Sequence, residues 1–100
     1  MKMKFRIYKI RKEKLEKLLT WAKELSTTYK SEALAALREE KVSREYVGIF
    51  YIENEPYALC FMEGECLPAS DSELNRKHKE VMRDCIETSY PLDTAYDLSE

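Results

Sequence analysis

Two neighbouring segments rich in β-branched and aromatic residues place the strongest constraint on how this chain can fold. Residues 42–52 and residues 57–62 have the composition of β-strands, and the Glu-Asn-Glu-Pro stretch at 53–56 joins them with turn-forming residues. Successive side chains of a strand point to opposite faces. The first segment therefore carries Val47, Ile49 and Tyr51 on one face and Tyr46, Phe50 and Ile52 on the other. A sheet with one face in water should alternate apolar with polar residues, so the sequence predicts a hairpin that is covered on both faces.

The N-terminal part of the chain predicts one strand followed by a long helix. Residues 3–7 alternate apolar and basic side chains, which indicates a strand. From Arg11 to about Lys41, apolar residues recur at steps of three and four, as on the buried face of a helix. The Ser-Thr-Thr run at 26–28 is poor helix-forming material, so we expect a kink or a break there.

The part that follows the hairpin predicts a second helix and a last strand. Ser70 and Glu73 have the spacing of a capping box, with Ser70 as the N-cap. Pro91 ends this helix, and residues 94–98 form a short strand. The apolar stripe of the helix consists of Leu74, His78, Val81, Met82, Cys85 and Ser89.

The resulting order, β-α-β-β-α-β, predicts an α+β fold. Two helices cover one apolar face of a four-stranded antiparallel sheet, because neither helix can bury its stripe alone, and the arrangement is that of a ferredoxin-like sandwich. In that topology the strand at 3–7 lies between the strands at 57–62 and 94–98. The second apolar face stays open, and a patch of that size marks an interaction site. We expect a second copy of the chain to cover it, which gives a homodimer.

Length and composition limit the chain to one folded domain over residues 1–100. Hydrophobic residues make up 44% of it and charged residues 36%, and disordered chains lack that much apolar material. No apolar run approaches the roughly 20 residues that span a bilayer, and residues 1–10 lack the apolar core of a signal peptide. The three cysteines, Cys60, Cys66 and Cys85, form no CxxC pair. We therefore expect reduced thiols, no metal, no membrane partner and a cytoplasmic location.

Positive and negative charges are divided unevenly along the chain. Residues 1–50 hold 13 Lys and Arg against 7 Asp and Glu, whereas residues 51–100 hold 4 against 12. A basic half could bind nucleic acid, but the predicted topology sets the basic first strand beside acidic neighbours. The expected ion pairs are those of Lys4 and Arg6 with Glu63, Asp93 and Asp97. The third strand also has no Lys or Arg beside its aromatic residues, so we expect no nucleic-acid partner.

His78 is the only histidine, and it lies within the apolar stripe of the second helix. One interpretation is structural, namely a core histidine bonded to a backbone or tyrosine partner. The functional interpretation places it in a cleft between helix and sheet, as a catalytic base or an axial ligand. It should then border a pocket of several hundred Å³, the scale of ligand sites. Cys85 lies two turns, about 10.5 Å, further along the same face, so the two could hardly share one metal ion.

Tyr8, Trp21 and Tyr51 are further candidates for a ligand site. The chain has seven tyrosines and one tryptophan, and the usual role of such residues is packing, with the tyrosine hydroxyl left in water. The functional alternative is that they form, together with His78, a pocket whose polar tips orient a small aromatic or carbonyl ligand.

Three stretches resemble a known family: K-F-R-I-Y-K-I at 4–10, L-x-x-W-A-x-E-L at 18–25 and H-K-E-V-M-R-D-C at 78–85. They are similar to an uncharacterised bacterial and archaeal family, a domain of unknown function placed among the dimeric α/β-barrel proteins. The resemblance covers nearly the whole chain, implies a ferredoxin-like dimer and assigns no activity. The wider superfamily includes cofactor-free monooxygenases, haem-degrading enzymes and isomerases that use the cleft between sheet and helices. This chain lacks the first-strand asparagine of the haem-degrading members, and only His78 could stand in for their haem ligand.

Three functions stay open at this point. The first is a homodimeric α/β-barrel domain that binds a small ligand in a helix–sheet cleft without a cofactor. The second is a cofactor-free or haem-type monooxygenase-like enzyme with His78 as its catalytic residue. The third, a nucleic-acid-binding domain, has the least support, because the strand at 57–62 has aromatic residues but no Lys or Arg.

Overall fold

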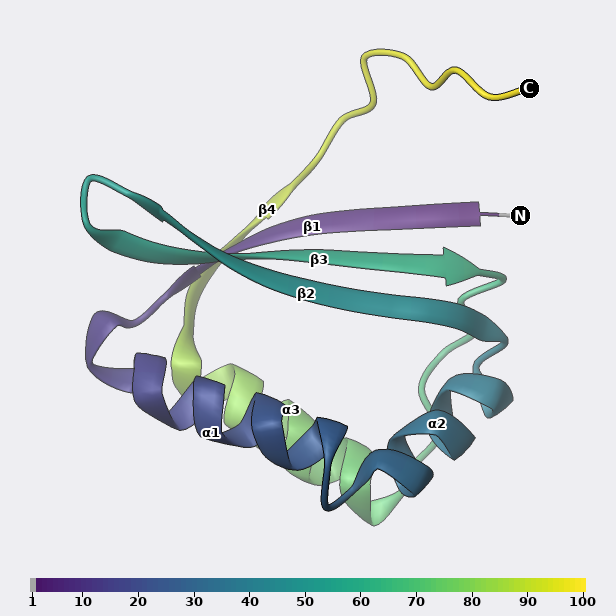
Figure 1. Ribbon diagram of the computed structural model, residues 1–100, viewed down its shortest axis with the longest axis horizontal. Coiled ribbons are helices and arrows are strands. Elements are labelled where there is room, and N and C mark those ends of the chain that lie inside the picture. Colours follow the sequence, from purple (N-terminus) through teal and green to yellow (C-terminus); the bar gives the residue numbers. More distant parts are fainter. Residues whose placement is uncertain (1) are drawn as a thin grey trace.

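A computed structural model describes residues 2–100, in which a layer of helices lies against one face of a sheet (Figure 1). In chain order the elements are β1 (Lys2–Ile10), the short 3-10 helix η1 (Lys12–Lys14), α1 (Leu15–Ser26), α2 (Lys30–Glu39), β2 (Val42–Ile52), β3 (Glu55–Gly64), α3 (Glu73–Cys85) and β4 (Ile86–Pro91). The described part of the chain is thus α+β, with a four-stranded sheet and three α-helices. None of these helices is long and apolar enough to cross a membrane.

The sheet is antiparallel throughout, with the strand order β2-β3-β1-β4. The first strand lies between β3 and β4, as expected from the order of the elements. β2 and β3 form the predicted hairpin, in which Ile52 pairs with Glu55. The two residues between them, Glu53 and Asn54, have φ values of 50° and 67°. Positive φ at both central residues is the mark of the two-residue turn whose twist suits a hairpin.

The helix predicted over residues 11–41 is interrupted at the Ser-Thr-Thr run. α1 ends at Ser26, and α2 begins at Lys30. In the last turn of α1 the Ser26 hydroxyl donates a hydrogen bond to the Ala22 carbonyl at 2.8 Å, and the Thr27 hydroxyl donates one to the Lys23 carbonyl at 2.7 Å. Such side chains compete with the helical backbone for its carbonyl groups, which explains why the helix stops here.

The predicted start of the C-terminal helix was wrong by two residues. Ser72 is the N-cap of α3, and its Oγ accepts a hydrogen bond from the Asn75 backbone N–H at 3.1 Å. Ser70 instead holds the side chain of Asn75, because the Asn75 amide nitrogen donates to the Ser70 carbonyl at 2.9 Å. Ser70 and Ser72 both lie just before the helix, so the sequence alone could not decide which of them is the N-cap.

The predicted end of that helix and the last strand were also wrong. α3 ends at Cys85, and the chain continues directly into β4, whereas residues 94–98 form no strand. Ile86 pairs with Ile10, and Tyr90 pairs with Ile7. β-Branched and aromatic residues alternate along Ile86–Tyr90. Such residues favour an edge strand of the sheet over a further turn of helix. Ser89, predicted on the helical stripe, therefore lies in β4.

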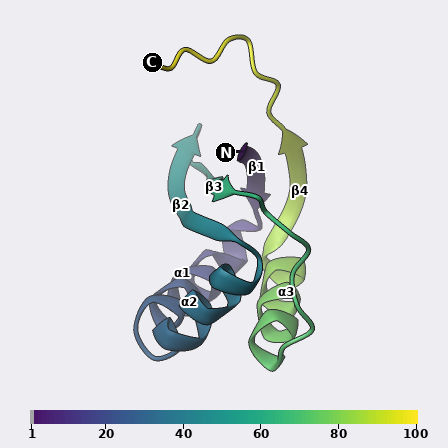
Figure 2. The same cartoon turned by 90° about the vertical axis from the view of Figure 1, so that its right-hand side faces the viewer.

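The helices bury their apolar faces at one end of the sheet. α1 and α3 run side by side beneath the strands, and all three helices lie on the same side (Figure 2). The core cluster consists of Ile10, Leu18, Trp21, Ala58, Val81 and Cys85. The cluster contains residues of α1, α3, β1 and β3, so it packs the helical layer against the sheet.

Ion pairs join the basic N-terminal half to the acidic C-terminal half. Lys9 pairs with Glu87 at 3.2 Å, Lys14 and Lys17 pair with Asp84 at 3.2 and 2.6 Å, and Lys41 pairs with Glu65 at 3.8 Å. The expected pairs of Lys4 and Arg6 with Glu63, Asp93 and Asp97 are not formed within residues 2–100. The register explains the difference, because Lys4 lies opposite Met62 and Arg6 opposite Cys60.

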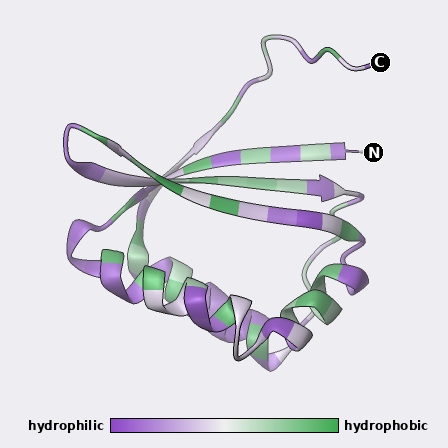
Figure 3. Cartoon of the chain, in the orientation of Figure 1, coloured by the Kyte–Doolittle hydropathy of each residue, from purple (hydrophilic) through white to green (hydrophobic). Residues whose placement is uncertain are grey.

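The face of the sheet turned away from the helices is apolar and open. Hydrophobic residues follow one another along β3, whereas β1 alternates (Figure 3). This open face carries Phe5, Ile7, Tyr46, Phe50, Tyr57, Leu59, Phe61 and Tyr90, which the strand registers align. The Phe5 and Phe61 rings are 5.0 Å apart, and the Phe50 and Tyr57 rings 5.4 Å. The segment after β4 passes above the sheet (Figure 2), and its residues 92–97 border a cavity together with Met3 and Phe5 of β1.

Candidate functional site

Two adjoining cavities lie between the helices and the sheet. The larger, which we name the cleft cavity, has a volume of about 270 Å³. It is lined by Tyr8, Leu18, Leu19, Trp21, Ala22, Leu25, Glu45, Val47, Ile49, Ala58, Cys60, Met62, His78 and Met82. The smaller, the acidic cavity, has a volume of about 180 Å³ and lies between α2, α3 and the start of β2. Leu25, Glu45 and His78 line both cavities.

His78 is held at the junction by a hydrogen bond from Trp21. The indole Nε1–H donates to His78 Nδ1 at 2.9 Å. An indole can only donate, so Nδ1 must be the unprotonated nitrogen of the ring. The proton of the neutral imidazole is therefore on Nε2, which leaves His78 a hydrogen-bond donor on its remaining nitrogen.

The side chain of Trp21 is held in place by Tyr29 and Lys77. It is 3% exposed, and its ring packs against Tyr29 with centroids 5.8 Å apart. The ammonium group of Lys77 lies over both rings, 5.1 Å from the Trp21 centroid and 5.4 Å from that of Tyr29. A cation over an aromatic face is attracted to it, so the indole is held in position to donate to His78.

The titratable groups that line the cleft cavity, apart from Glu45, are neutral near pH 7. Burial raises the pKa of Tyr8, and burial followed by the negative charge of Glu45 raises the pKa of Cys60 to about 11. Burial also lowers the pKa of His78. A protonated thiol is a poor nucleophile. The cleft cavity therefore offers apolar walls, a phenol, a thiol and an imidazole N–H, with one carboxylate at its edge.

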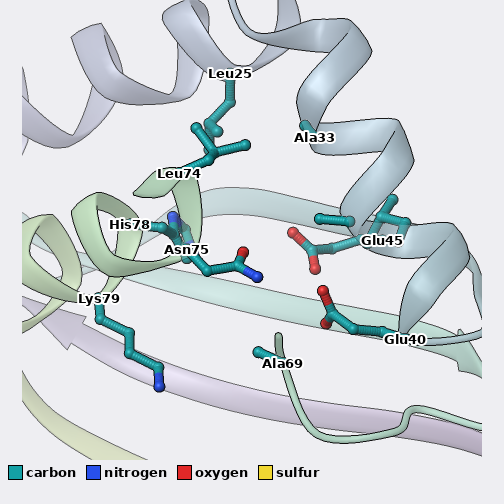
Figure 4. A pocket seen from close by; sticks show the side chains of 11 residues that line it. Leu25, Ala33, Glu40, Glu45, Ala69, Leu74, Asn75, His78 and Lys79 are labelled. Carbon is teal, nitrogen blue, oxygen red and sulfur yellow. The ribbon is translucent and has the colours of Figure 1, made fainter. Parts of the chain in front are cut away.

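The acidic cavity holds two carboxylates close together. Figure 4 shows Glu40, from the C-terminal end of α2, and Glu45, from β2, reaching into it from the same side, with Asn75 across from them. Burial, and then the charge of neighbouring Glu39, raises the pKa of Glu40. Burial, and then the charge of Glu40, raises the pKa of Glu45. Both carboxylates are thus easier to protonate than carboxylates in water.

Residues 1–99 match the sequence profile of a family of unknown function, DUF6176. The chain belongs to the DUF6176 family. No curated protein and no solved structure matches it. The match to DUF6176 assigns no activity, so the case for function rests on the geometry of the site.

Three of the four predicted site residues of this DUF6176 chain meet at one place. Tyr8, Trp21 and His78 all line the cleft cavity. Tyr51 lies outside it, near the hairpin end of β2, with 59% of its surface exposed. Cys85, the other polar neighbour considered for His78, is fully buried in the core.

The two glutamates of the acidic cavity were not among the site residues predicted from the sequence. A signal for Glu45 existed, because it alternates with Val47 and Ile49 and so must share their face of β2. A carboxylate in an otherwise apolar set of strand residues marks a special position. Glu40 gave no such signal, since it lies in the charged run Glu39–Lys41. Among the described residues, no three His, Cys, Asp or Glu side chains are grouped so that they could hold a metal ion.

Proposed function

We propose that the chain binds a small, largely apolar ligand in the cleft cavity, and that His78 donates a hydrogen bond to it through Nε2. The observation that carries this proposal is the Trp21–His78 hydrogen bond at the cavity wall, which presents one oriented N–H beside apolar side chains. Ligand sites typically combine apolar walls with a few polar groups that fix orientation.

The size of the cleft cavity supports a ligand with one ring. An apolar cavity of about 150 Å³ can hold benzene, and the cleft cavity measures about 270 Å³. A single aromatic ring with a short chain therefore fits. Met82 and Met62, on opposite walls of the cavity, can adapt to the outline of such a ligand because methionine side chains are flexible and polarizable.

The same geometry favours binding over the monooxygenase-like alternative. A general base must accept a proton, and an axial ligand must offer a nitrogen lone pair to iron. With Nδ1 occupied by the Trp21 N–H, Nε2 carries the proton and has no lone pair to give. Either role would require His78 to exchange tautomers and lose the bond to Trp21.

The proposal can be tested directly, because Trp21 is the only tryptophan and lines the cavity. Addition of 2-phenylethanol in the millimolar range should change its fluorescence and reach saturation. Ala22 lines the cavity, so Ala22→Phe should fill it and abolish the change. Thr20→Phe, on an exposed position of α1 that does not line the cavity, is the matched control and should respond like the wild type. An unsaturable response, or an equal response in Ala22→Phe, would refute ligand binding in the cleft.

We also propose that the protein is a homodimer of ferredoxin-like domains that pair through the open face of the sheet, as in dimeric α/β-barrel proteins. The strand order and the single helical layer support this class of fold. Exposed aromatic residues on the other face support the pairing, among them Phe5 at 38%, Tyr90 at 43% and Tyr46 at 51% exposure. Tyrosine and phenylalanine are enriched in the core of protein interfaces.

A further inference from the structure

Glu40 is a buried charged side chain for which the fold provides no partner. The residue is 9% exposed, and within residues 2–100 its carboxylate takes part in no hydrogen bond or ion pair. Its backbone is fixed on both sides, because its N–H donates to the Ala36 carbonyl and its own carbonyl accepts from the Leu67 N–H. The side chain is thus held against the acidic cavity, and its oxygens remain accessible there. An unpaired carboxylate in such a place is costly.

Glu45 increases the free-energy cost of burying the charged Glu40 side chain. Its carboxylate lies close to that of Glu40 (Figure 4), and two like charges at one site disfavour each other. Asn75 adds a third acceptor group on the opposite side, since its amide nitrogen donates to the Ser70 carbonyl and its Oδ1 is free to accept. The two carboxylates and the Asn75 Oδ1 are all acceptors, and a cation with several N–H groups would satisfy them.

No cation of the described chain fills this place. Lys79 lines the cavity, but its Nζ points away from both carboxylates (Figure 4), and it forms no ion pair with either. Arg76, one turn before Lys79, pairs with Asp71 at 2.9 Å. The cation must therefore come from outside.

The walls of the cavity select the kind of cation. They consist mainly of alanine and leucine side chains, Leu37 and Leu74 among them. A magnesium or calcium ion needs six or more oxygen ligands and retains water where the protein supplies few. An organic ammonium group needs fewer acceptors, and its carbon chain gains from contact with apolar walls.

We propose that the acidic cavity binds the ammonium group of a small arylalkyl amine, held between Glu40 and Glu45, while its ring lies in the cleft cavity. His78 and Leu25, which line both cavities, lie where the short alkyl chain passes from one cavity to the other. This inference rests on the proposed function, because the ring occupies the site proposed there, and it adds the chemical class of the ligand.

The test compares three probes of nearly equal size: 2-phenylethylamine, 2-phenylethanol and 3-phenylpropionate. Binding to the full chain at pH 7.5 is measured by isothermal titration calorimetry and by two-dimensional amide NMR. The amine should bind about tenfold or more tightly than the alcohol, and the carboxylate should not bind. That ratio corresponds to about 1.4 kcal/mol. Amide shifts caused by the amine should include residues at the end of α2 and the start of β2.

Variants that keep the shape but remove charge complete the test. Glu40→Gln should weaken amine binding about tenfold and leave alcohol binding unchanged, since Glu40 does not line the cleft cavity. Glu45→Gln should also weaken amine binding about tenfold. Glu39→Gln is the matched control, since Glu39 is exposed and does not line the acidic cavity, and it should change neither affinity.

Equal affinities for amine and alcohol, or an unchanged amine affinity in both variants, would overturn the ammonium site while leaving the cleft proposal intact. Failure of all three probes to bind would overturn both proposals. Displacement of the amine by magnesium or calcium chloride at concentrations where sodium chloride of equal ionic strength has no effect would show an inorganic cation site instead.

Discussion

At the scale of single residues, the pair Trp21–His78 shows how one hydrogen bond orients a polar side chain at the wall of a cavity. The indole N–H determines which ring nitrogen of His78 carries the proton, and burial lowers the pKa of the imidazole. The partner of His78 is an indole, whereas the structural interpretation of the sequence expected a backbone or tyrosine partner. His78 is neither sealed in the core nor free, because one nitrogen is satisfied by the fold and the other is available at a cavity.

The lowered pKa of His78 predicts a specific dependence of stability on pH. Below about pH 6.5, the reference value of histidine, the unfolded chain binds a proton that the folded chain resists. Stability should therefore be complete above that pH and fall as the pH is lowered towards the folded-state pKa. His78→Asn removes the titration and retains an oxygen that can accept from Trp21. Relative to this variant, the wild type should lose stability as the pH falls below about 6.5.

Urea unfolding followed by circular dichroism at several pH values measures this difference. The comparison with His78→Asn is needed because the raised pKa values of Glu40 and Glu45 have the opposite sign. Their protonation in the folded state stabilises it as the pH falls. If wild type and His78→Asn showed parallel pH profiles, the burial of the imidazole would have no energetic consequence.

At the scale of elements, the sequence predicted each strand of the hairpin and the break between α1 and α2, because local composition controls both. It could not separate α3 from β4. The apolar stripe of α3 ends at Cys85, and the alternating pattern of β4 begins at Ile86. No turn-forming residue separates the two patterns. Pairing with β1 decides the boundary, and that pairing is a tertiary contact that no local pattern contains.

The end of β3 also depends on one residue whose importance is not evident from the sequence. Gly64 pairs with Val42 of β2 and with Lys2 of β1, and its φ is +138°, a value that L-residues rarely adopt. A Cβ atom there would collide with the backbone carbonyl oxygen of Lys41. Gly64→Ala should therefore destabilise the protein by at least about 2 kcal/mol through strain and steric conflict.

Gly48, in the middle of β2, is the matched control for this prediction. Its added Cβ would approach only the side chain of Tyr46, at 3.0 Å, and that side chain can move. Gly48→Ala should change the free energy of unfolding by less than about 1 kcal/mol. Urea midpoints of the two variants provide the comparison, and equal losses would contradict the role assigned to the backbone of Gly64.

At the scale of the whole molecule, the single chain has more surface than a compact monomer. It exposes 7572 Å² for a mass of 11.9 kDa, whereas a monomeric protein of that mass exposes about 5,900 Å². Its radius of gyration is 14.1 Å, against about 12.7 Å expected for 100 residues. A standard interface buries about 800 Å² per partner, so the excess is large enough to supply one.

The segment after β4 contributes to that excess, since Tyr96 is 80% and Leu98 85% exposed, and the open face of the sheet contributes as well. The hairpin is apolar on both faces. The helix layer covers one of them, and the other stays largely open within residues 2–100. Which partner covers it is not encoded in any local pattern, because a sequence records which faces are apolar but not what meets them. A second copy is the proposed partner, since a face of this kind can pair with itself across a two-fold axis.

The dimer predicts that one charge on the open face separates the protomers. Leu59 lies near the middle of this face, opposite Ile7 on one side and Gly48 on the other. Leu59→Arg would bury an unpaired charge in the interface, so sedimentation should give the mass of one 11.9 kDa chain instead of two. Leu34→Arg, on an exposed position of α2 with 42% of the leucine surface in water, is the control and should remain dimeric.

The melting temperature of the wild type should rise with protein concentration, because association stabilises the folded state, and that of Leu59→Arg should not. A wild-type protein that sediments as a monomer at micromolar concentration, with a melting temperature independent of concentration, would show that the open face has another partner.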